Sequence, residues 1–380
     1  MLKINHFFIS GSLILVLVIL SAFLEEKKIK YTQNPTISYD GKAQTIVTAY
    51  KDTLNNDSLY LVRTEQNIPL NYFKKIITEV CFDNECRLLD ITVFWNITGR
   101  YLGFELVNNE FLSKHDHEPF VASEYERLNE LLADPTLPLG DTSFEKLIEL
   151  PENEDDSVDG VSGATSVEVS KMVVKGAAYT TYTLWNIVHG STKDLISNLT
   201  EKQLTPDLIH LILKSGDVSD KVWALNRIDQ FTVLNSKLAT SLLDIIASKD
   251  FFLSYSALNA IKTSHLNSDT LQDALFSIYP EADHSIKNMI VKKLMEAPYL
   301  NSEVVDSSRK LLINLNGQQL NSFLKLYTKF KVNDLQTCLS ISEILQNDNR
   351  FIARQAYNFL RSSHVTDQRI QDRIIKYYPK

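Results

Sequence analysis

A short segment near the middle of the chain holds residues whose types and spacing suit phosphoryl chemistry. It reads Asp159-x-x-Ser162-Gly163-Ala164-Thr165. A threonine hydroxyl can attack phosphorus, and Gly163 and Ala164 have almost no side chain, so another enzyme's active site can admit this backbone closely. Phosphoryl transfer depends mainly on positioning and on neutralisation of charge, usually by Mg²⁺ and acidic ligands. Asp159 is therefore a candidate to hold the segment or a metal while Thr165 is modified.

This segment resembles the flavinylation motif of the FMN-binding domain family. The family includes flavin-bearing components of the sodium-translocating NADH:quinone reductase and of the Rnf complex. The resemblance implies that a dedicated flavin transferase attaches FMN to Thr165 through a phosphoester bond. The other cofactor-binding residues that it implies are Asp159, Ser162, Gly163 and Ala164. The resemblance is specific over 159–165, extends over about 45–190, and implies loading outside the cytoplasm.

A purely structural interpretation of the same residues remains open. Thr165 and Glu168 also form a capping box, in which a hydroxyl caps a helix and a glutamate follows three residues later. A glycine-rich turn before a capped helix needs no ligand. An attached phosphate would also suit a helix N-terminus, where free N–H groups favour an anion. The two interpretations compete for one oxygen, because an esterified threonine has lost its hydroxyl proton.

A long helix is predicted directly after Thr165, ending at His189-Gly190 with a glycine C-cap. Apolar and small residues fall at helical spacing along it: Val169, Val173, Ala177, Thr180, Leu184 and Val188. It also carries three aromatic residues as candidates to line a flavin ring: Tyr179, Tyr182 and Trp185. Aromatic residues in this position more often belong to a protein core.

The segment before the motif predicts a mixture of strands and helices. Runs rich in β-branched and aromatic residues predict strands at 76–82, 88–95 and 104–107, the last after breaks at Gly99 and Gly103. A capping box from Ser123 to Glu126 predicts a helix to about 133, and a short helix is predicted at 143–150. The region 45–190 is therefore predicted to be an α+β domain.

The N-terminus predicts a membrane anchor. Residues 7–24 form a run of 18 uncharged, mostly apolar residues, which suits a short transmembrane helix or the core of a signal peptide. Leu20 stands where a small residue is wanted before a cut after Ala22, so the cleavage signal is weak. We expect an uncleaved anchor at 1–24, followed by a polar linker at 25–44. The flanking lysines do not select an orientation, and the resemblance places the bulk of the chain on the periplasmic side.

Charge and cysteine content narrow the function classes further. The net charge is −8, and no cluster of Lys and Arg is interleaved with aromatics, which argues against a nucleic-acid partner. Cys81 and Cys86 flank a predicted hairpin turn and are either within disulfide reach or two free thiols. Cys338 lies in a helical pattern and is predicted to be buried.

One loop offers several metal-ligating side chains within four residues: His115, Asp116, His117 and Glu118. In a loop these side chains would alternate in direction, and no distant set of Cys and His residues completes a coordination sphere. A solvated polar loop is the favoured interpretation, so no metal site is assigned. No Walker loop, dinucleotide fingerprint or Gly-x-Ser-x-Gly nucleophile motif is present either, and no catalytic residue is assigned.

From 191 onward the strand signals vanish and a spacing of 33 residues emerges. Two sets of positions repeat at this spacing: Leu225, Leu258, Val291, Leu324 and Tyr357, and Ile228, Ile261, Leu294, Tyr327 and Leu360. The pattern resembles HEAT-type helical repeats, in which paired helices stack on one another. The region 191–380 is therefore predicted to be an all-α repeat domain. Such a domain offers a surface to a protein partner, or it only stabilises and spaces the domain before it.

The predicted architecture is an α+β FMN-binding domain at 45–190 followed by HEAT-like helical repeats at 191–380, with an N-terminal transmembrane or signal segment. The predicted function is extracytoplasmic, membrane-anchored electron transfer by FMN carried on Thr165, as a carrier rather than a stand-alone enzyme. The expected partners are a flavin transferase, a redox partner protein, a protein on the repeats, and the membrane through the N-terminal helix.

Two other functions remain open. One is a non-redox scaffold that uses the repeats, with 162–165 a plain helix cap. The other is a flavin reductase or dehydrogenase, which ranks lower because no acid/base pair is evident. Four carboxylates precede the motif and are expected to disfavour anionic reduced flavin, lowering its potential: Glu152, Glu154, Asp155 and Asp156.

Overall fold

The computed structural model describes residues 29–38, 45–52, 57–79, 88–114, 117–140, 143 and 171–377. The chain divides into two compact units, Met1–Gln203 and Leu204–Lys380. The first combines an antiparallel sheet with helices, and the second is all-α, so the predicted order of an α+β part and an all-α part is confirmed. Within the described ranges, no helix combines the length and apolar character needed to span a membrane. The apolar run at 7–24 lies outside those ranges.

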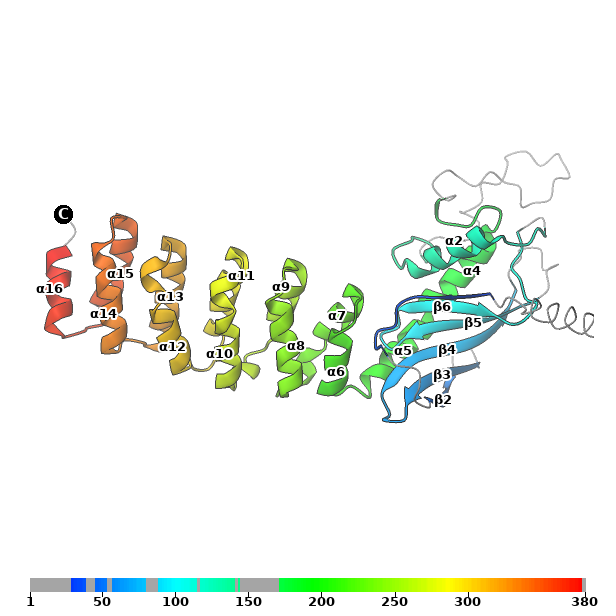
Figure 1. The fold of residues 1–380 in the computed structure, drawn as a ribbon, viewed down its shortest axis with the longest axis horizontal. Coiled ribbons are helices and arrows are strands. Elements are labelled where there is room, and N and C mark those ends of the chain that lie inside the picture. The colour runs from blue at the N-terminus through cyan, green and yellow to red at the C-terminus, as the bar shows by residue number, and fades with distance from the viewer. Residues whose placement is uncertain are drawn as a thin grey trace, which may run out of the picture. The chain divides into compact units, whose positions relative to one another are not determined.

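The first unit is built on a six-stranded antiparallel sheet with the strand order β1-β6-β5-β4-β3-β2 (Figure 1). The strands are β1 (Lys30–Thr32), β2 (Thr45–Asp52), β3 (Asp57–Thr64), β4 (Pro69–Thr78), β5 (Leu89–Asn96) and β6 (Tyr101–Leu106). The predicted strands at 88–95 and 104–107 correspond to β5 and β6. The strand predicted at 76–82 overlaps only the end of β4. Strands β2 and β3 were not predicted from the sequence.

The predicted linker at 25–44 is wrong for part of its length. Lys30–Thr32 forms β1, which pairs with β6 in the register Tyr31↔Phe104 and Thr32↔Gly103. Gly103 has a φ of +148°, and a Cβ on it would lie 1.9 Å from the carbonyl oxygen of Tyr31. Gly103 therefore lies inside a strand instead of breaking it, because only a residue without a side chain allows β1 to approach so closely.

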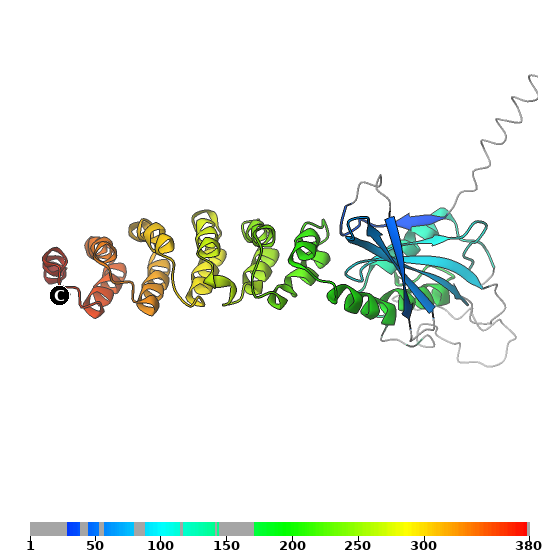
Figure 2. The same ribbon diagram turned by 90° about the horizontal axis from the view of Figure 1, so that it is seen from below.

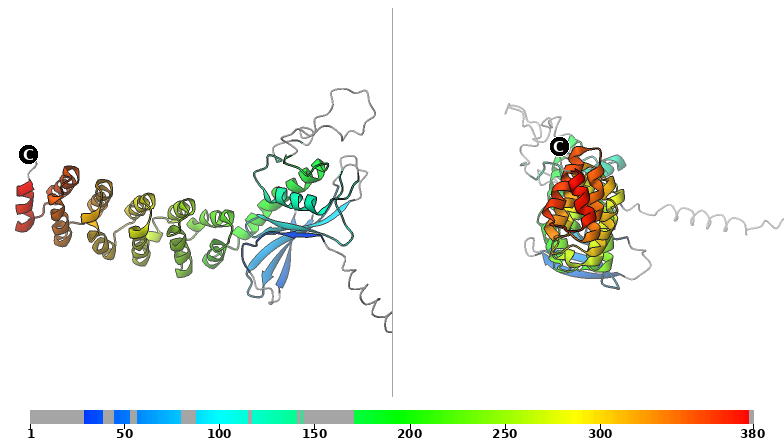
Figure 3. Two further views of the ribbon diagram at one scale, coloured as in Figure 1. Left: turned by 45° about the horizontal axis from the view of Figure 1, so that its top comes forward. Right: turned by 90° about the vertical axis from the view of Figure 1, so that its left-hand side faces the viewer.

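One face of the sheet is buried under helices (Figure 3). Side chains along a strand alternate between faces, and on β5 Leu89, Ile91, Val93 and Trp95 are all buried. The covering helices are α2 (Ala122–Ala133) and α4 (Ala178–His189). Leu128 of α2 and Leu184 of α4 are fully buried in this layer. The core of the first unit therefore lies between the sheet and these two helices.

The other face of the sheet carries a row of half-buried aromatic rings on three adjacent strands. Tyr60 of β3 pairs with Phe73 of β4, and Phe73 pairs with Phe94 of β5. The ring centroids lie 5.0 Å apart for Tyr60 and Phe73 and 6.0 Å apart for Phe73 and Phe94. Cross-strand aromatic pairs stabilise a sheet by a few tenths of a kcal/mol to about 1 kcal/mol each. This row therefore holds the central strands in register.

The start of α2 differs in detail from its prediction. The helix begins at Ala122 rather than Ser123, and the Glu124 carboxylate accepts a hydrogen bond of 2.8 Å from the backbone N–H of Val121. The glutamate that closes the first turn is thus Glu124, not the predicted Glu126. A single-sequence pattern places helix ends only to within a few residues, because several polar residues here could act as caps.

Helix α5 (Ser191–Glu201) belongs with the sheet rather than with the repeats. The Tyr72 hydroxyl of β4 lies 3.3 Å from the Thr200 hydroxyl, and Arg63 of β3 donates a hydrogen bond of 2.7 Å to the Gln203 side chain. Each of these contacts joins residues that are more than one hundred positions apart in the sequence. The boundary between the two units therefore falls after Gln203, whereas the sequence pattern predicted it at 190.

The second unit is a succession of helix pairs (Figures 1 and 2). The first helices of the pairs are α6 (Pro206–Leu213), α8 (Ser236–Ile246), α10 (Asp269–Ser277), α12 (Ser302–Arg309), α14 (Leu335–Glu343) and α16 (Gln368–Tyr377). The second helices are α7 (Val218–Leu225), α9 (Phe251–Ala260), α11 (His284–Met295), α13 (Gly317–Phe330) and α15 (Arg350–Ser362). Short 3₁₀ turns follow many of them, at Ile228–Gln230, His265–Asn267, Tyr279–Glu281, Leu312–Asn314 and Ile344–Gln346.

The 33-residue period governs both the caps and the core of this unit. The N-cap residues of the second helices follow one another at this spacing: Asp217, Asp250, Asp283, Asn316 and Asn349. So do those of four first helices: Asn235, Ser268, Asn301 and Asp334. The repeating positions Ile228, Ile261, Leu294, Tyr327 and Leu360 are all buried. Each pair therefore repeats one local design, with a polar cap and an apolar face that packs on the neighbouring pair.

Candidate functional site

The motif at the centre of the sequence prediction lies outside the described residues. This applies to the predicted cofactor-binding residues Asp159, Ser162, Gly163, Ala164 and Thr165, and also to Glu168 and the acidic loop before the motif. The chain is described again from Lys171. Lys171 is therefore the first described residue after the motif, and the part of the fold that follows it can be examined.

Residues 171–177 form a turn rather than the predicted continuous helix, so that prediction is wrong over this range. Gly176 has a φ of +75°, a left-handed conformation that interrupts a right-handed helix. The backbone N–H of Val174 bonds to the Thr181 hydroxyl at 3.1 Å, outside any helical ladder. The Ala177 N–H bonds to the Val174 carbonyl at 2.9 Å, and α4 then begins at Ala178. The predicted end at His189-Gly190 is confirmed.

Lys114 holds this turn against the loop that leads to α2. Its Nζ lies 3.1 Å from a carboxylate oxygen of Glu118 and 3.2 Å from one of Glu124. Hydrogen bonds to these two carboxylates raise the pKa of Lys114. A Cβ on Gly176 would lie 3.2 Å from the Lys114 side chain, so the turn passes closely over its aliphatic part. Arg127 of α2 adds a hydrogen bond to the Lys171 carbonyl.

This role of Lys114 was not predicted from the sequence, where the loop was considered only for its possible metal ligands. Glu118 instead pairs with Lys114, while His115 and Asp116 lie outside the described residues. His117 has a φ of +60°, which places it at the tip of a tight turn. Among the described residues no group of three or more His, Cys, Asp and Glu side chains is arranged to hold a metal. The pair closes a loop and does not lie on a helix, so the i,i+4 rule for helix surfaces gave no signal for it in the sequence.

The three aromatic residues proposed to line a flavin divide into two groups. Trp185 is buried, and its Nε1 donates a hydrogen bond of 2.9 Å to the Asp134 carbonyl. Its ring also packs 4.4 Å from the His189 ring, between centroids. Trp185 is thus a core residue and is not free to stack on a flavin. Tyr179 and Tyr182 are half-buried in the first turns of α4, directly after the turn at 171–177.

His189 is the most strongly perturbed titratable group near α4. Its Nε2 lies 3.0 Å from the Leu132 carbonyl oxygen, which ties the end of α4 to the end of α2. Burial, with a smaller contribution from the charge of Lys193, lowers the pKa of His189 to about 4, although the bond to Leu132 opposes the shift. The imidazole is therefore neutral at pH 7 and donates Nε2–H to the carbonyl. It serves the packing of α4 rather than proton transfer.

Within the described residues, the first unit contains no pair of cysteines that could form a disulfide. Cys81 and Cys86, and with them the predicted hairpin turn, lie outside the described residues. Cys338 is a free, buried thiol on α14, as predicted, and burial raises its pKa to about 11. A thiol with so high a pKa carries almost no thiolate at neutral pH and is poorly reactive.

Comparison of the chain with family models, with curated proteins and with solved structures finds no match. The resemblance at 159–165 therefore carries the family hypothesis by itself. What the fold adds is the position of the turn at 171–177, which is anchored by Lys114, Arg127 and Thr181.

Proposed function

We propose that this chain is a membrane-anchored, extracytoplasmic electron-transfer protein that carries FMN covalently on Thr165. The observation that carries this proposal is the segment Asp159-x-x-Ser162-Gly163-Ala164-Thr165. It combines an acceptor hydroxyl, two residues with little or no side chain and an acidic residue at the spacing of the flavinylation motif. The α+β unit that contains it supports the proposal at the level of fold class.

The anchored turn supports the proposal because a tethered cofactor needs a defined point of attachment. Lys171 follows Thr165 by six positions, and six extended residues span at most roughly 20 Å. A flavin on Thr165 is therefore tethered near the N-terminal end of α4. Lys171 and Lys175 are exposed cations of this turn, suited to offset the charge of a phosphodiester.

The described residues are suited to contact the edge of a bound FMN rather than to enclose its ring system. Tyr179 and Tyr182 offer half-buried aromatic faces in the first turns of α4, while Trp185 is committed to the core. Bound FMN supplies the one- and two-electron chemistry, and the protein supplies tether, orientation and local charge. A covalent link is useful outside the cytoplasm, where a released cofactor would be lost.

For the second unit we propose membership of the HEAT-like class of helical repeats, acting as a binding surface for a partner protein. Paired helices at a constant spacing of 33 residues support this proposal. If Thr165 serves only as a helix cap, this surface alone would define a scaffold function. The turn at 171–177 shows only that α4 itself does not extend back to Thr165.

The test of flavinylation is a denaturing gel of the exported full-length protein, co-produced with a flavin transferase and viewed under ultraviolet light. Fluorescence that survives denaturation is expected in the parent and absent in Thr165→Ala. A matched control is Thr181→Ser, which keeps the hydroxyl that bonds to Val174 and should remain fluorescent. A dark parent band beside an active control substrate of the transferase would contradict the proposal and favour the scaffold.

A further inference from the structure

Two successive grooves on the first helices of the second unit occupy equivalent positions of the repeat. One groove, of about 590 Å³, lies between α8 and α10, and the next, of about 370 Å³, lies between α10 and α12. Their lining residues correspond at a spacing of 33: Thr240 with Asp273, Leu243 with Phe276, Thr270 with Glu303, Leu271 with Val304, and Ala274 with Ser307. The two grooves are therefore consecutive copies of one feature.

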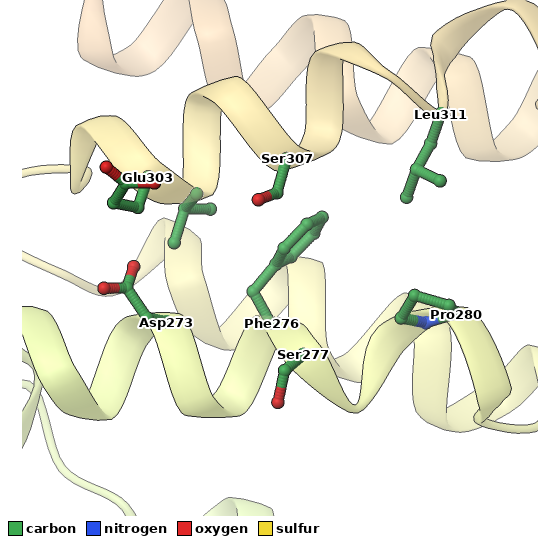
Figure 4. Close-up of a pocket in the computed structure, with 8 residues that line it drawn as sticks. Asp273, Phe276, Ser277, Pro280, Glu303, Ser307 and Leu311 are labelled. Carbon is green, nitrogen blue, oxygen red and sulfur yellow. The ribbon is translucent and has the colours of Figure 1, made fainter.

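The copies differ in charge but not in apolar character. The α8/α10 groove is lined mostly by apolar and hydroxyl-bearing residues such as Val233 and Leu243, together with His265 and Asn267, and no described residue in its lining carries a carboxylate. Val233 is 75% exposed. In the α10/α12 groove, Asp273 and Glu303 replace the two threonines. Figure 4 shows both carboxylates at one end of that groove, with the Phe276 ring beside them. An apolar site and an acidic site thus follow each other along the unit.

Asp273 is held in place, but no cation of the described chain neutralises it. Its Oδ1 accepts a hydrogen bond of 2.6 Å from the Nδ2 of Asn301, which orients the carboxylate. Among the described residues neither Asp273 nor Glu303 has an ion-pair partner within 4.0 Å, the limit for such a pair. A half-buried carboxylate, Asp273, and an exposed one, Glu303, at one end of an apolar groove are complementary to a cation with an aliphatic stem.

In the next repeat, the carboxylate equivalent to Asp273 has a guanidinium partner within the chain. Asp306 is the equivalent of Asp273, and Arg309 is the equivalent of Phe276, at the same spacing of 33. The guanidinium of Arg309 contacts the Asp306 carboxylate within α12. The chain therefore supplies its own guanidinium at one copy of this position. At the previous copy, Phe276 stands in place of the arginine, so that repeat supplies no guanidinium of its own at this position.

We propose that these two grooves together bind an extended segment of a partner protein that carries an apolar side chain and a lysine or arginine about three residues apart. Neighbouring helices pack roughly 8–10 Å apart. An extended chain in the polyproline II conformation rises about 3.1 Å per residue and completes a turn every three residues, so side chains three apart point to the same side. Three residues therefore span the distance between the grooves. The apolar side chain enters the α8/α10 groove, and the cation meets Asp273 and Glu303. This proposal does not depend on the flavin, because both grooves lie in the second unit.

The test selects peptides from a random dodecapeptide display library on the immobilised full-length protein. The enriched peptides are expected to share a Lys or Arg with an apolar residue about three positions from it. A synthetic, fluorescein-labelled copy should bind the parent, and its Kd should rise at least five-fold for Asp273→Asn/Glu303→Gln. Higher salt should weaken binding to the parent, since Glu303 is exposed and Asp273 is only half-buried. Thr240→Lys, which places a cation in the α8/α10 groove, should also weaken it.

The matched control is Glu343→Gln/Asp348→Asn, which removes two exposed carboxylates outside both grooves and should leave the Kd unchanged. The substitutions at Asp273 and Glu303 preserve side-chain shape, and unchanged thermal unfolding would show that the variant is folded. Failure to enrich any peptide would overturn the proposal. So would enrichment of acidic peptides, or equal binding by the parent and Asp273→Asn/Glu303→Gln.

Discussion

The indole N–H of Trp95 on β5 donates a hydrogen bond of 2.8 Å to the backbone carbonyl oxygen of Val188, in the last turn of α4. Both residues are buried, so neither group has water as an alternative partner. The last carbonyl groups of a helix lack partners within the helix. This single bond therefore satisfies one of them and fixes α4, the helix that follows the motif segment, on the sheet.

Trp95→Phe is expected to lower the free energy of unfolding of the first unit by roughly 2–4 kcal/mol. The variant leaves the Val188 carbonyl buried without its partner and also opens a small cavity. Hydrogen-exchange mass spectrometry of peptides from the sheet and from α4 would measure the loss unit by unit. The control is Trp223→Phe in α7, a half-buried ring that packs on Arg227 at 3.8 Å. Equal effects of the two substitutions on the sheet peptides would contradict the role of the Trp95 bond.

Two aspartates at the same repeat position provide a matched test of helix capping. The Asp250 side chain accepts a hydrogen bond of 3.0 Å from the N–H of Leu253, whereas Asp283 makes no side-chain cap bond. Asp250→Ala should therefore cost about 1 kcal/mol of the stability of the second unit. Asp283→Ala should cost less than about 0.5 kcal/mol, because it loses only the favourable charge at the helix N-terminus. Urea denaturation would measure both, and equal losses would show that the cap bond contributes nothing.

His189 should make the first unit sensitive to acid. Its folded pKa is about 4, and an unfolded histidine has a pKa near 6.5. Between these values the unfolded chain binds more protons, so stability falls as the pH drops from about 6.5 to about 4. At about 1.4 kcal/mol for each unit of pKa difference, the full shift corresponds to roughly 3.5 kcal/mol. Because His189 is only half-buried, solvent screening reduces the expected loss to roughly 2–3 kcal/mol.

His189→Gln should remove this part of the pH dependence while keeping a donor for the Leu132 carbonyl. The measurement is urea denaturation at pH 7 and at pH 4.5, with the difference between parent and variant isolating His189 from the carboxylates. An exposed histidine, His284, serves as the control position through His284→Gln. A pH slope that is unchanged in His189→Gln would contradict the assignment.

The acidic loop before the motif should lower the midpoint potential of the flavin under the proposed function. Carboxylates close to the cofactor disfavour the anionic semiquinone and hydroquinone. Neutralising all four residues should therefore raise the potential: Glu152, Glu154, Asp155 and Asp156. A spectroelectrochemical titration would measure it, with Glu343→Gln/Asp348→Asn as the control for charge removal far from the motif in sequence. No change would mean that the loop lies too far from the flavin or is fully screened.

Local patterns in the sequence were enough to predict the helical half of the fold. The 33-residue spacing placed Ile228, Ile261 and Leu294 on buried faces, as the structure shows. The same holds for the end of α4 at His189, where a glycine follows the last turn. These features depend on residues close together in the chain, and such local propensities are legible in a single sequence.

Contacts between distant residues could not be predicted in this way. The hydrophobic pattern of the sequence did not predict the pairing of Tyr31 with Phe104. It also did not predict that α5 lies beside the sheet, through Tyr72 and Thr200, or that the chain turns at Gly176. A strand of three residues such as β1 has too little periodicity to stand out from a polar linker. Its existence depends on Gly103, more than seventy residues later, which leaves room for it.

The sequence by itself determined the class of each half of the protein, the period of its repeats and the one motif that suggests a cofactor. Only the tertiary structure decided that α4 packs on the sheet through the bond from Trp95 to Val188, and that Asp273 and Glu303 line one groove. The physical reason is that capping and amphipathic spacing act within one or two helical turns. Strand register, groove lining and buried hydrogen bonds such as that from Trp95 to Val188 arise only when separate elements pack together.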